Sequence, residues 1–192
     1  MHFNYVEIGS NYFGTLADKL PGPGLMLEPI PEYFHLIPDR FDLIKRCVAL
    51  DIQPVSRDMY YWPRESIREG EECLQGCGSF LENHAMVDEN TTITRHRTTV
   101  PCITWADLIN IYSIRSIGYL KLDCEGYDCV LLNELLRIKP PNLRIDTIQF
   151  ETNANTSAYD VSATIKNLRQ HGYVIVLTGH DTIMKLQDVP VL

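Results

Sequence analysis

An apolar strand that ends in a group of acids occupies residues 117–128, Ile117-Gly118-Tyr119-Leu120-Lys121-Leu122-Asp123-Cys124-Glu125-Gly126-Tyr127-Asp128. Its first half is the short apolar run of a buried strand. Gly126 lets the chain turn sharply toward a helix expected over Val130–Ile138. Asp123 and Glu125 stand where the chain leaves the sheet. Because an acid buried there costs stability unless a partner satisfies it, this strand end predicts a functional site.

Strands and helices alternate on both sides of this segment. Strands are expected at Tyr5–Ile8, Leu25–Leu27, Arg46–Leu50, Ile117–Leu122, Thr147–Phe150, Tyr173–Leu177 and Thr182–Leu186. Helices are expected at Phe13–Leu20, Pro31–Leu36, Val130–Ile138 and Ala158–Gln170, and one more begins at Thr104 with a capping box to Asp107. The alternation predicts an α/β, Rossmann-like fold with a mostly parallel sheet. A hairpin between the last two strands predicts an antiparallel C-terminal edge strand.

The length of 192 residues suits one domain, which we expect to span residues 1–192. Between about residues 51 and 97 the periodicity weakens, apart from a strand-like run at Met59–Trp62. Long irregular stretches inside a compact domain usually have a function. This segment is therefore predicted to be a lid or an acceptor-binding loop.

Charge and hydropathy disfavour two classes of partner. The formal net charge of −8 disfavours nucleic-acid binding, which depends on basic side chains that neutralise phosphates. The densest basic cluster, Arg95-His96-Arg97, is interpreted as a solvated loop or strand edge. No apolar run approaches the roughly 20 residues that a membrane-spanning helix needs. We expect no nucleic acid and no membrane among the partners.

The cysteines and the first residues indicate a cytoplasmic protein. Met1–Tyr5 has neither a basic leader nor a long apolar stretch, so no secretory signal is expected. The chain contains six cysteines, Cys47, Cys73, Cys77, Cys102, Cys124 and Cys129, which are expected to be reduced thiols. Cys73 and Cys77 with His84 and Cys102 form a minor alternative, a zinc site, but the spacing differs from a C-x-x-C knuckle.

The first expected strand leads into Glu7, Gly9, Ser10 and Asn11, and the second ends at Glu28. In parallel open sheets, ligands bind beyond the carboxyl ends of the strands. A carboxylate such as Glu28 accepts hydrogen bonds from ribose hydroxyls. The stretch lacks G-x-G-x-x-G, and Glu7 would repel phosphates but suits an ammonium group. S-adenosylmethionine carries an ammonium and a sulfonium and no phosphate, so these residues are predicted to bind it.

Glu151 ends the next expected strand after Asp123, within Phe150-Glu151-Thr152-Asn153. Glu7, Glu28, Asp123 and Glu151 are therefore expected to converge on one cleft. Asp128 is interpreted differently, as an acid that stabilises the N-terminus of the helix that follows it.

At these residues the chain resembles the FkbM-type methyltransferases. The matching segments, in the family's order, are Val6–Asn11, Leu27–Ile30, Gly76–Ser79, Ile103–Leu108, Tyr119–Asp128 and Ile148–Asn153. The resemblance implies a class I methyltransferase fold, S-adenosylmethionine as cofactor, and methylation of a hydroxyl oxygen. It also implies cofactor binding by Glu7 and Gly9, ribose binding by Glu28, and an acidic motif beside the transferred methyl, made by Asp123 and Glu125.

Two questions about the chemistry stay open. The proton of the acceptor hydroxyl needs a base, and the candidates are His84 and Asp123. Alternatively, Asp123, Glu151 and Asn153 hold a divalent cation, for which their hard oxygen ligands favour Mg²⁺. The acceptor is expected to be a small molecule such as a sugar, and its identity and the oligomeric state are not determined by the sequence.

Two alternatives from other classes also remain. A nicotinamide-dependent oxidoreductase would use the same ribose acid, but glycines would be expected where Asn11 and Tyr12 stand. A non-catalytic nucleoside-binding or scaffold module of the same fold would bind the cofactor without transferring a methyl group.

Overall fold

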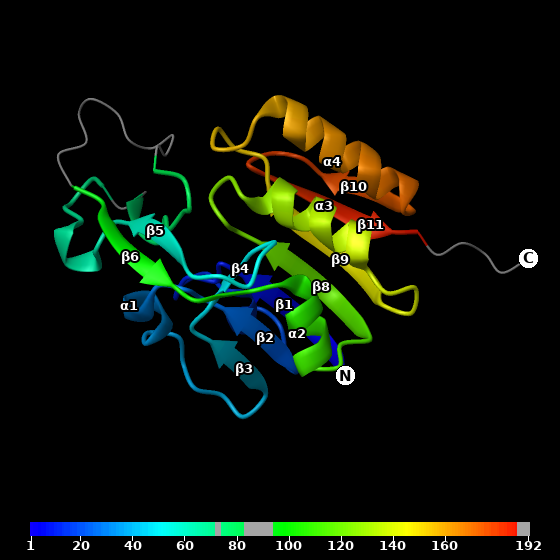
Figure 1. Cartoon of the computed structure of the whole chain (residues 1–192), viewed down its shortest axis with the longest axis horizontal. Helices are drawn as coiled ribbons and strands as arrows, with labels where there is room; N and C mark the ends of the chain where they lie inside the picture. Colours follow the sequence, from blue (N-terminus) through cyan, green and yellow to red (C-terminus); the bar gives the residue numbers. More distant parts are fainter. Residues whose placement is uncertain (72–73, 83–93, 188–192) are drawn as a thin grey trace, which may run out of the picture.

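The computed structural model describes residues 1–71, 74–82 and 94–187. These residues form a seven-stranded sheet in the order β10-β11-β9-β8-β1-β2-β3 (Figure 1). Its strands are β1 (His2–Ile8), β2 (Gly24–Leu27), β3 (Leu43–Arg46), β8 (Ser116–Leu122), β9 (Arg144–Glu151), β10 (Tyr173–Leu177) and β11 (Asp181–Leu186). The fold is therefore α/β with a mostly parallel, mixed sheet, as predicted.

The antiparallel strand lies one position away from where the sequence predicted it. β11 pairs antiparallel with both β9 and β10, so it lies between them and β10 is the edge strand. The expectation of an antiparallel C-terminal edge strand is wrong in that detail. A hairpin fixes only that its two strands are neighbours, and the pairing of β11 with β9 then leaves β10 outermost.

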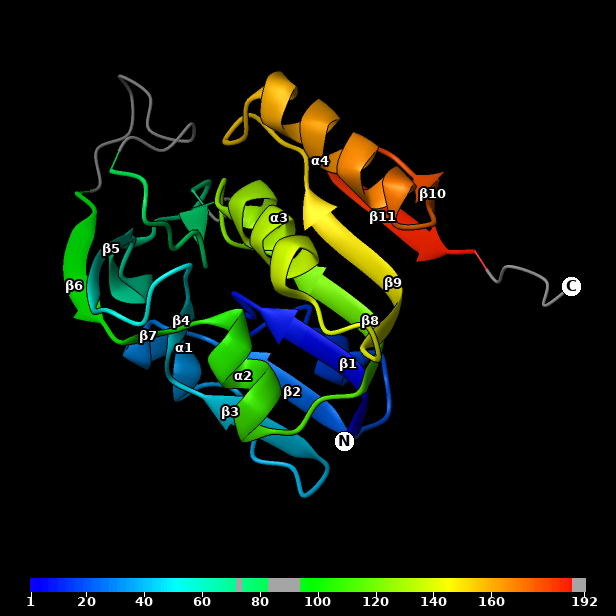
Figure 2. The ribbon, with the colours of Figure 1, turned by 45° about the vertical axis from the view of Figure 1, so that its right-hand side comes forward.

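Three helices cover one face of the sheet: α2 (Trp105–Ile111), α3 (Asp128–Ile138) and α4 (Ala158–Gln170). They lie on the same side in Figures 1 and 2 and enclose the main apolar core with alternate side chains of the central strands. The predicted capping box starts α2, because Thr104 Oγ1 accepts from the Asp107 N–H at 3.1 Å. Near β1 and β2 the opposite face is covered by the 3₁₀ turn η1 (Leu16–Asp18), α1 (Pro31–Phe34) and their neighbours.

A second, smaller layer lies beyond the carboxyl ends of the parallel strands. β4 (Ala49–Leu50) pairs parallel with β7 (Cys102–Ile103), and β5 (Arg57–Tyr61) pairs antiparallel with β6 (His96–Val100). Figure 2 shows this β5–β6 ribbon beyond the arrowheads of β1 and β8. A 3₁₀ turn, η2 (Arg64–Ser66), follows β5. The segment predicted to be irregular thus contains an ordered ribbon.

Two predicted elements are wrong. Phe13–Leu20 is not a helix, since only Leu16–Asp18 forms a 3₁₀ turn and Phe13 is half-exposed. The backbone at Gly14 has a φ of +63°, and the turn begins only at Thr15. The expected strand at Arg46–Leu50 is split into two, because β3 ends at Arg46 and the chain then crosses to pair with β7.

None of the helices within the described ranges combines the length and apolar character that crossing a bilayer requires.

Candidate functional site

The ends of β1 and β8 meet at the point where the strand order reverses. β1 leads to β2 on one side, whereas β8 lies on its other side. The Asp123 N–H donates to the Ile8 carbonyl at 2.9 Å, and Gly9 has a φ of +72°. A Cβ at Gly9 would lie 2.1 Å from the Asp123 carbonyl oxygen. Glycine is therefore required here. The turn that follows β1 packs directly on the end of β8, which carries Asp123.

Glu28 lies at the end of β2, where it is only 4% exposed. Its Oε2 accepts from the Asn11 N–H at 2.7 Å and its Oε1 from the Ile30 N–H at 2.8 Å. Burial raises the pKa of Glu28 to about 7, although these two hydrogen bonds oppose the rise. Each carboxylate oxygen has a further lone pair, so the group can also accept hydrogen bonds from a ligand.

A hydrophobic pocket of about 460 Å³, its open mouth included, adjoins Glu28. Its walls come from four strand ends and from the loop at residues 76–80. The lining residues are Ile8, Gly9, Leu27, Glu28, Pro29, Val48, Ala49, Leu50, Met59, Gly76, Gly78, Phe80, Asp123, Cys124 and Tyr127.

A second hollow, the acidic pocket, encloses about 680 Å³ including its open side. Its lining residues are Gly9, Ser10, Asn11, Phe13, Gln75, Gly76, Lys121, Asp123, Glu125 and Glu151. Gly9, Gly76 and Asp123 line both hollows, so the two pockets adjoin. A ligand that fills the hydrophobic pocket can therefore present one end to the acids of the other.

The predicted cofactor turn lines these pockets, but Glu7 does not. Gly9, Ser10 and Asn11 all border the acidic pocket. Glu7 is fully buried, and its carboxylate accepts from the Lys121 ammonium at 3.0 Å and from the Leu16 N–H at 2.8 Å. It is absent from the described lining of both pockets, so the predicted direct contact with a ligand ammonium is replaced by a contact with Lys121.

Lys121 joins Glu7 to the acidic pocket. Its ammonium also lies 2.9 Å from Asp123 Oδ2, and the side chain is 15% exposed. Glu7 and Lys121 are register partners on β1 and β8, which places their side chains on the same face of the sheet. The two carboxylates raise the pKa of Lys121 although burial opposes this. The lysine therefore stays charged and orients Asp123.

Asp123, Glu125 and Glu151 form the acidic cluster of this pocket. Each offers an oxygen within 4.8 Å of the others. Asn155 Nδ2 donates to Glu125 Oε2 at 2.8 Å, and Asn153 Nδ2 donates to Glu151 Oε1 at 2.7 Å. Burial, together with the charges of Glu125 and Asp123, raises the pKa of Glu151 to about 10.

The predicted metal ligands are rearranged by this geometry. Asp123 and Glu151 do approach one another, but Glu125 is the third acid of the cluster. Asn153 instead donates its amide group to Glu151. Any divalent cation here would therefore be held by the three carboxylates, the oxygen ligands that Mg²⁺ prefers. This is the only group of potential metal ligands that the described part of the chain brings together.

Asp128 joins two strand ends as well as standing in the first turn of α3. It is fully buried, and its carboxylate accepts from the Cys124 N–H at 3.2 Å and from the Glu151 N–H at 3.4 Å. Burial and the nearby charge of Asp123 raise its pKa to about 7. Asp128 thus sets the distance between the loops that carry the acidic cluster.

The sequence does not point to several residues at or behind the site. Lys121 directly precedes the acidic strand end, and this position is the signal that could have identified it. The loop at 76–80 is indicated only by the family resemblance of Gly76–Ser79. Asp51 and Arg57 lie behind the hydrophobic pocket, where they contact Tyr127 and Phe80. Arg95 is not simply solvated as predicted, because it donates to the carbonyls of Leu81, Glu82 and Tyr60.

Two predicted residues, His84 and Cys73, lie outside the described residues, so the histidine base and the zinc alternative stay predictions. Cys77 and Cys102 are buried, and burial raises the pKa of both thiols.

Comparison of the chain with protein-family models, with curated proteins and with solved structures found no match.

Proposed function

We propose that this chain is an S-adenosylmethionine-dependent methyltransferase that methylates a hydroxyl oxygen of a sugar or another small metabolite. One observation carries the proposal. Glu28 and Asp123 line the same pocket at the reversal point of an open α/β sheet, the usual ligand site of such sheets. Glu28, the carboxylate proposed to bind the ribose, thus lies near the acidic pocket, whose carboxylates suit a sulfonium and an ammonium group.

The topology supports a Rossmann-like class I methyltransferase fold. Numbered along the chain, the strands from β3 to β9 follow the order 3-2-1-4-5, as in doubly wound nucleotide-binding sheets. The antiparallel strand expected of this fold is β11. The family resemblance from the sequence points to the same fold.

The chemistry of the lining fits this cofactor better than a dinucleotide. Lys121 is the single cation among the described lining residues of the two pockets, and it is already paired with Glu7 and Asp123. The Leu16 N–H, near the start of η1, is taken by Glu7. A pyrophosphate would therefore meet acids and find no unpaired cation among these lining residues, and the N–H group near the start of η1 is already taken.

In this proposal Glu28 holds the ribose hydroxyls, and Gly9, Ser10 and Asn11 border the amino-acid part. Bound S-adenosylmethionine supplies a methyl carbon activated by the sulfonium. The chain's own residues then orient the acceptor and exclude water. Asp123 and Glu125 are the described carboxylates proposed to take the proton of the hydroxyl group.

Calorimetric titration tests the cofactor assignment. S-adenosylhomocysteine is expected to bind with micromolar affinity, NAD is expected not to bind, and Glu28→Ala is expected to lose binding of the former. Binding of NAD in its place would contradict the proposal and favour an oxidoreductase.

Transfer of a labelled methyl group to a library of sugars and hydroxylated metabolites tests the activity. Labelled product that disappears in Asp123→Asn is the expected result. Tight cofactor binding with no transfer to any acceptor would instead favour the non-catalytic nucleoside-binding module.

A further inference from the structure

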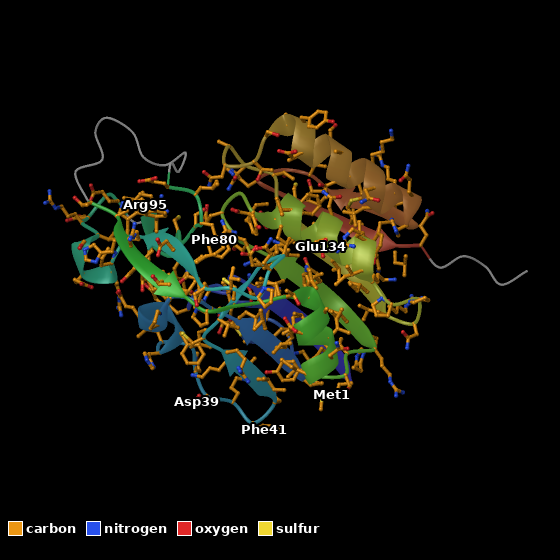
Figure 3. The ribbon with its side chains drawn as sticks, viewed as in Figure 1. Met1, Asp39, Phe41, Phe80, Arg95 and Glu134 are labelled. Carbon is orange, nitrogen blue, oxygen red and sulfur yellow. The ribbon has the colours of Figure 1, made fainter. Side chains whose placement is uncertain are left out.

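One part of the wall of the hydrophobic pocket is formed by aromatic rings from two distant segments. Phe80 is the last residue of the loop at 76–80, and Tyr127 precedes α3. Their ring centroids are 5.3 Å apart at an interplanar angle of 89°, an edge-to-face contact. Figure 3 shows Phe80 between the β5–β6 ribbon and the near end of α3.

Arg57, on β5, lies over this pair of rings. Its guanidinium carbon is 4.0 Å from the centroid of Phe80 and 5.3 Å from that of Tyr127. A planar guanidinium at this distance over a ring combines stacking with cation–π attraction. Arg57 itself is absent from the described lining of the pocket, so it acts on the pocket only through the rings.

Asp51 anchors both the arginine and one of the rings. Its Oδ2 accepts from Arg57 Nη1 at 3.0 Å and its Oδ1 from the Tyr127 hydroxyl at 2.7 Å. The side chain of Asp51 is only 2% exposed, whereas that of Arg57 is 35% exposed. A buried carboxylate with two such partners fixes the orientation of the guanidinium.

The loop that carries Phe80 is held from two sides. Ser79 exchanges backbone hydrogen bonds with Tyr60 at 2.9 Å, and its hydroxyl donates to the Glu125 carbonyl at 2.9 Å. These bonds fix the backbone of the loop. They leave the orientation of the Phe80 ring to Arg57 and Tyr127.

We propose that Arg57 is a positioning residue that holds Phe80 as the wall against which the base of the bound nucleoside packs. The inference rests on the proposed function, since it takes a nucleoside as the occupant of the hydrophobic pocket. A ring held on one side by a guanidinium loses little freedom when a base covers its other side. Arg57 therefore influences nucleoside affinity through Phe80, without itself touching the ligand.

The test measures the Kd of S-adenosylhomocysteine by calorimetry for the wild-type chain and for matched variants. Arg57→Lys keeps the charge opposite Asp51 but removes the planar stack, and Phe80→Leu keeps an apolar side chain but removes the ring. Each is expected to weaken binding about fivefold to tenfold, the scale of a cation–π contact that is lost. Arg64→Lys makes the same chemical change 5.7 Å from the ring of Tyr12, which lines neither pocket, and is expected to leave the Kd unchanged.

A double-mutant cycle distinguishes positioning from general damage. If Arg57 acts through Phe80, Arg57→Lys should have no further effect on the Kd in the Phe80→Leu background. Additive losses, or an unchanged Kd in Arg57→Lys, would overturn the inference. If Arg57→Lys does not fold, Phe80→Leu alone decides, and an unchanged Kd in that variant overturns it. Failure of the wild-type chain to bind S-adenosylhomocysteine would instead overturn the proposed function, and the inference with it.

Discussion

Glu28 couples burial to ligand binding at the scale of a single residue. With a pKa near 7, its carboxyl group changes charge close to neutral pH. The ionised form accepts hydrogen bonds with both oxygens, from two backbone N–H groups and from a ligand, whereas protonation turns one oxygen into a hydroxyl donor. Its ionised fraction rises from about one tenth at pH 6 to about nine tenths at pH 8.

The affinity for S-adenosylhomocysteine is therefore expected to increase up to about tenfold between pH 6 and pH 8. In Glu28→Gln the affinity should be lower and this pH dependence should be lost, as measured by calorimetry at several pH values. Glu134→Gln, on the α3 surface and paired with Arg137, is the control and should keep the dependence. If the affinity of Glu28→Gln changed with pH as much as that of the wild type, a group other than Glu28 would be the cause of the pH dependence.

Gly9 and Gly14 separate the cost of a backbone conformation from the cost of a collision. Both have positive φ, +72° and +63°, but a Cβ at Gly9 would meet the Asp123 carbonyl whereas one at Gly14 meets nothing within 4 Å. Gly14→Ala should lower the free energy of unfolding by about 1 kcal/mol. Gly9→Ala should lower it several-fold more, since backbone must move. Urea unfolding measures both losses of stability. Equal losses in the two variants would contradict the close packing of Gly9, after β1, on Asp123, after β8.

At the scale of elements, Lys121 links β1 to β8 by pairing with the fully buried Glu7. Lys121→Met leaves Glu7 without its counter-ion, and breaking a buried pair from one side costs about 3–5 kcal/mol. The double variant Glu7→Gln, Lys121→Met should regain a large part of that stability. Thermal and urea unfolding of these two variants and the wild type measure the effect, and a Lys121→Met variant as stable as the wild type would contradict the buried pair.

The capping box of α2 makes a smaller, local contribution. Thr104→Ala removes the acceptor of the Asp107 N–H and should lower the free energy of unfolding by about 1 kcal/mol. Cofactor affinity should not change, because Thr104 lines neither of the two pockets. A loss of affinity in this variant would mean that α2 influences the site.

At the scale of the whole molecule, buried acids determine how stability depends on pH. Glu28 and Asp128 both have a pKa near 7, above the ordinary values of 4.5 and 3.8. At a pH between the ordinary pKa and the raised one, each acid is still protonated in the folded chain but ionised in the unfolded chain. The free energy of unfolding therefore falls as pH rises.

We therefore expect the ligand-free chain to be more stable at pH 5.5 than at pH 8, by on the order of 2 kcal/mol for each acid at most. Urea unfolding at a series of pH values measures this. Saturating S-adenosylhomocysteine should reduce the fall of the free energy of unfolding with pH, because it binds the ionised form of Glu28. A ligand-free stability that rises over this range would contradict the two raised pKa values.

Local patterns predicted the elements well where they were strongly periodic. The helix at Ala158–Gln170 and the strand at Tyr173–Leu177 have the predicted bounds. Phe13–Leu20 failed because its helical spacing was overridden by Gly14 and by the hydrogen bond from Leu16 to Glu7. In the site, Gly9, Glu28 and Asp123 could be identified since each directly follows a strand.

Local spacing alone predicts the alternation of strands and helices and the acids at the strand ends. The packing in three dimensions places β11 inside the sheet, turns Glu7 toward Lys121 instead of a pocket, and brings Glu125 rather than Asn153 into the acidic cluster. These outcomes depend on pairing between segments about 30 to more than 100 residues apart. Such contacts are selected by how the whole core packs, which no local pattern encodes.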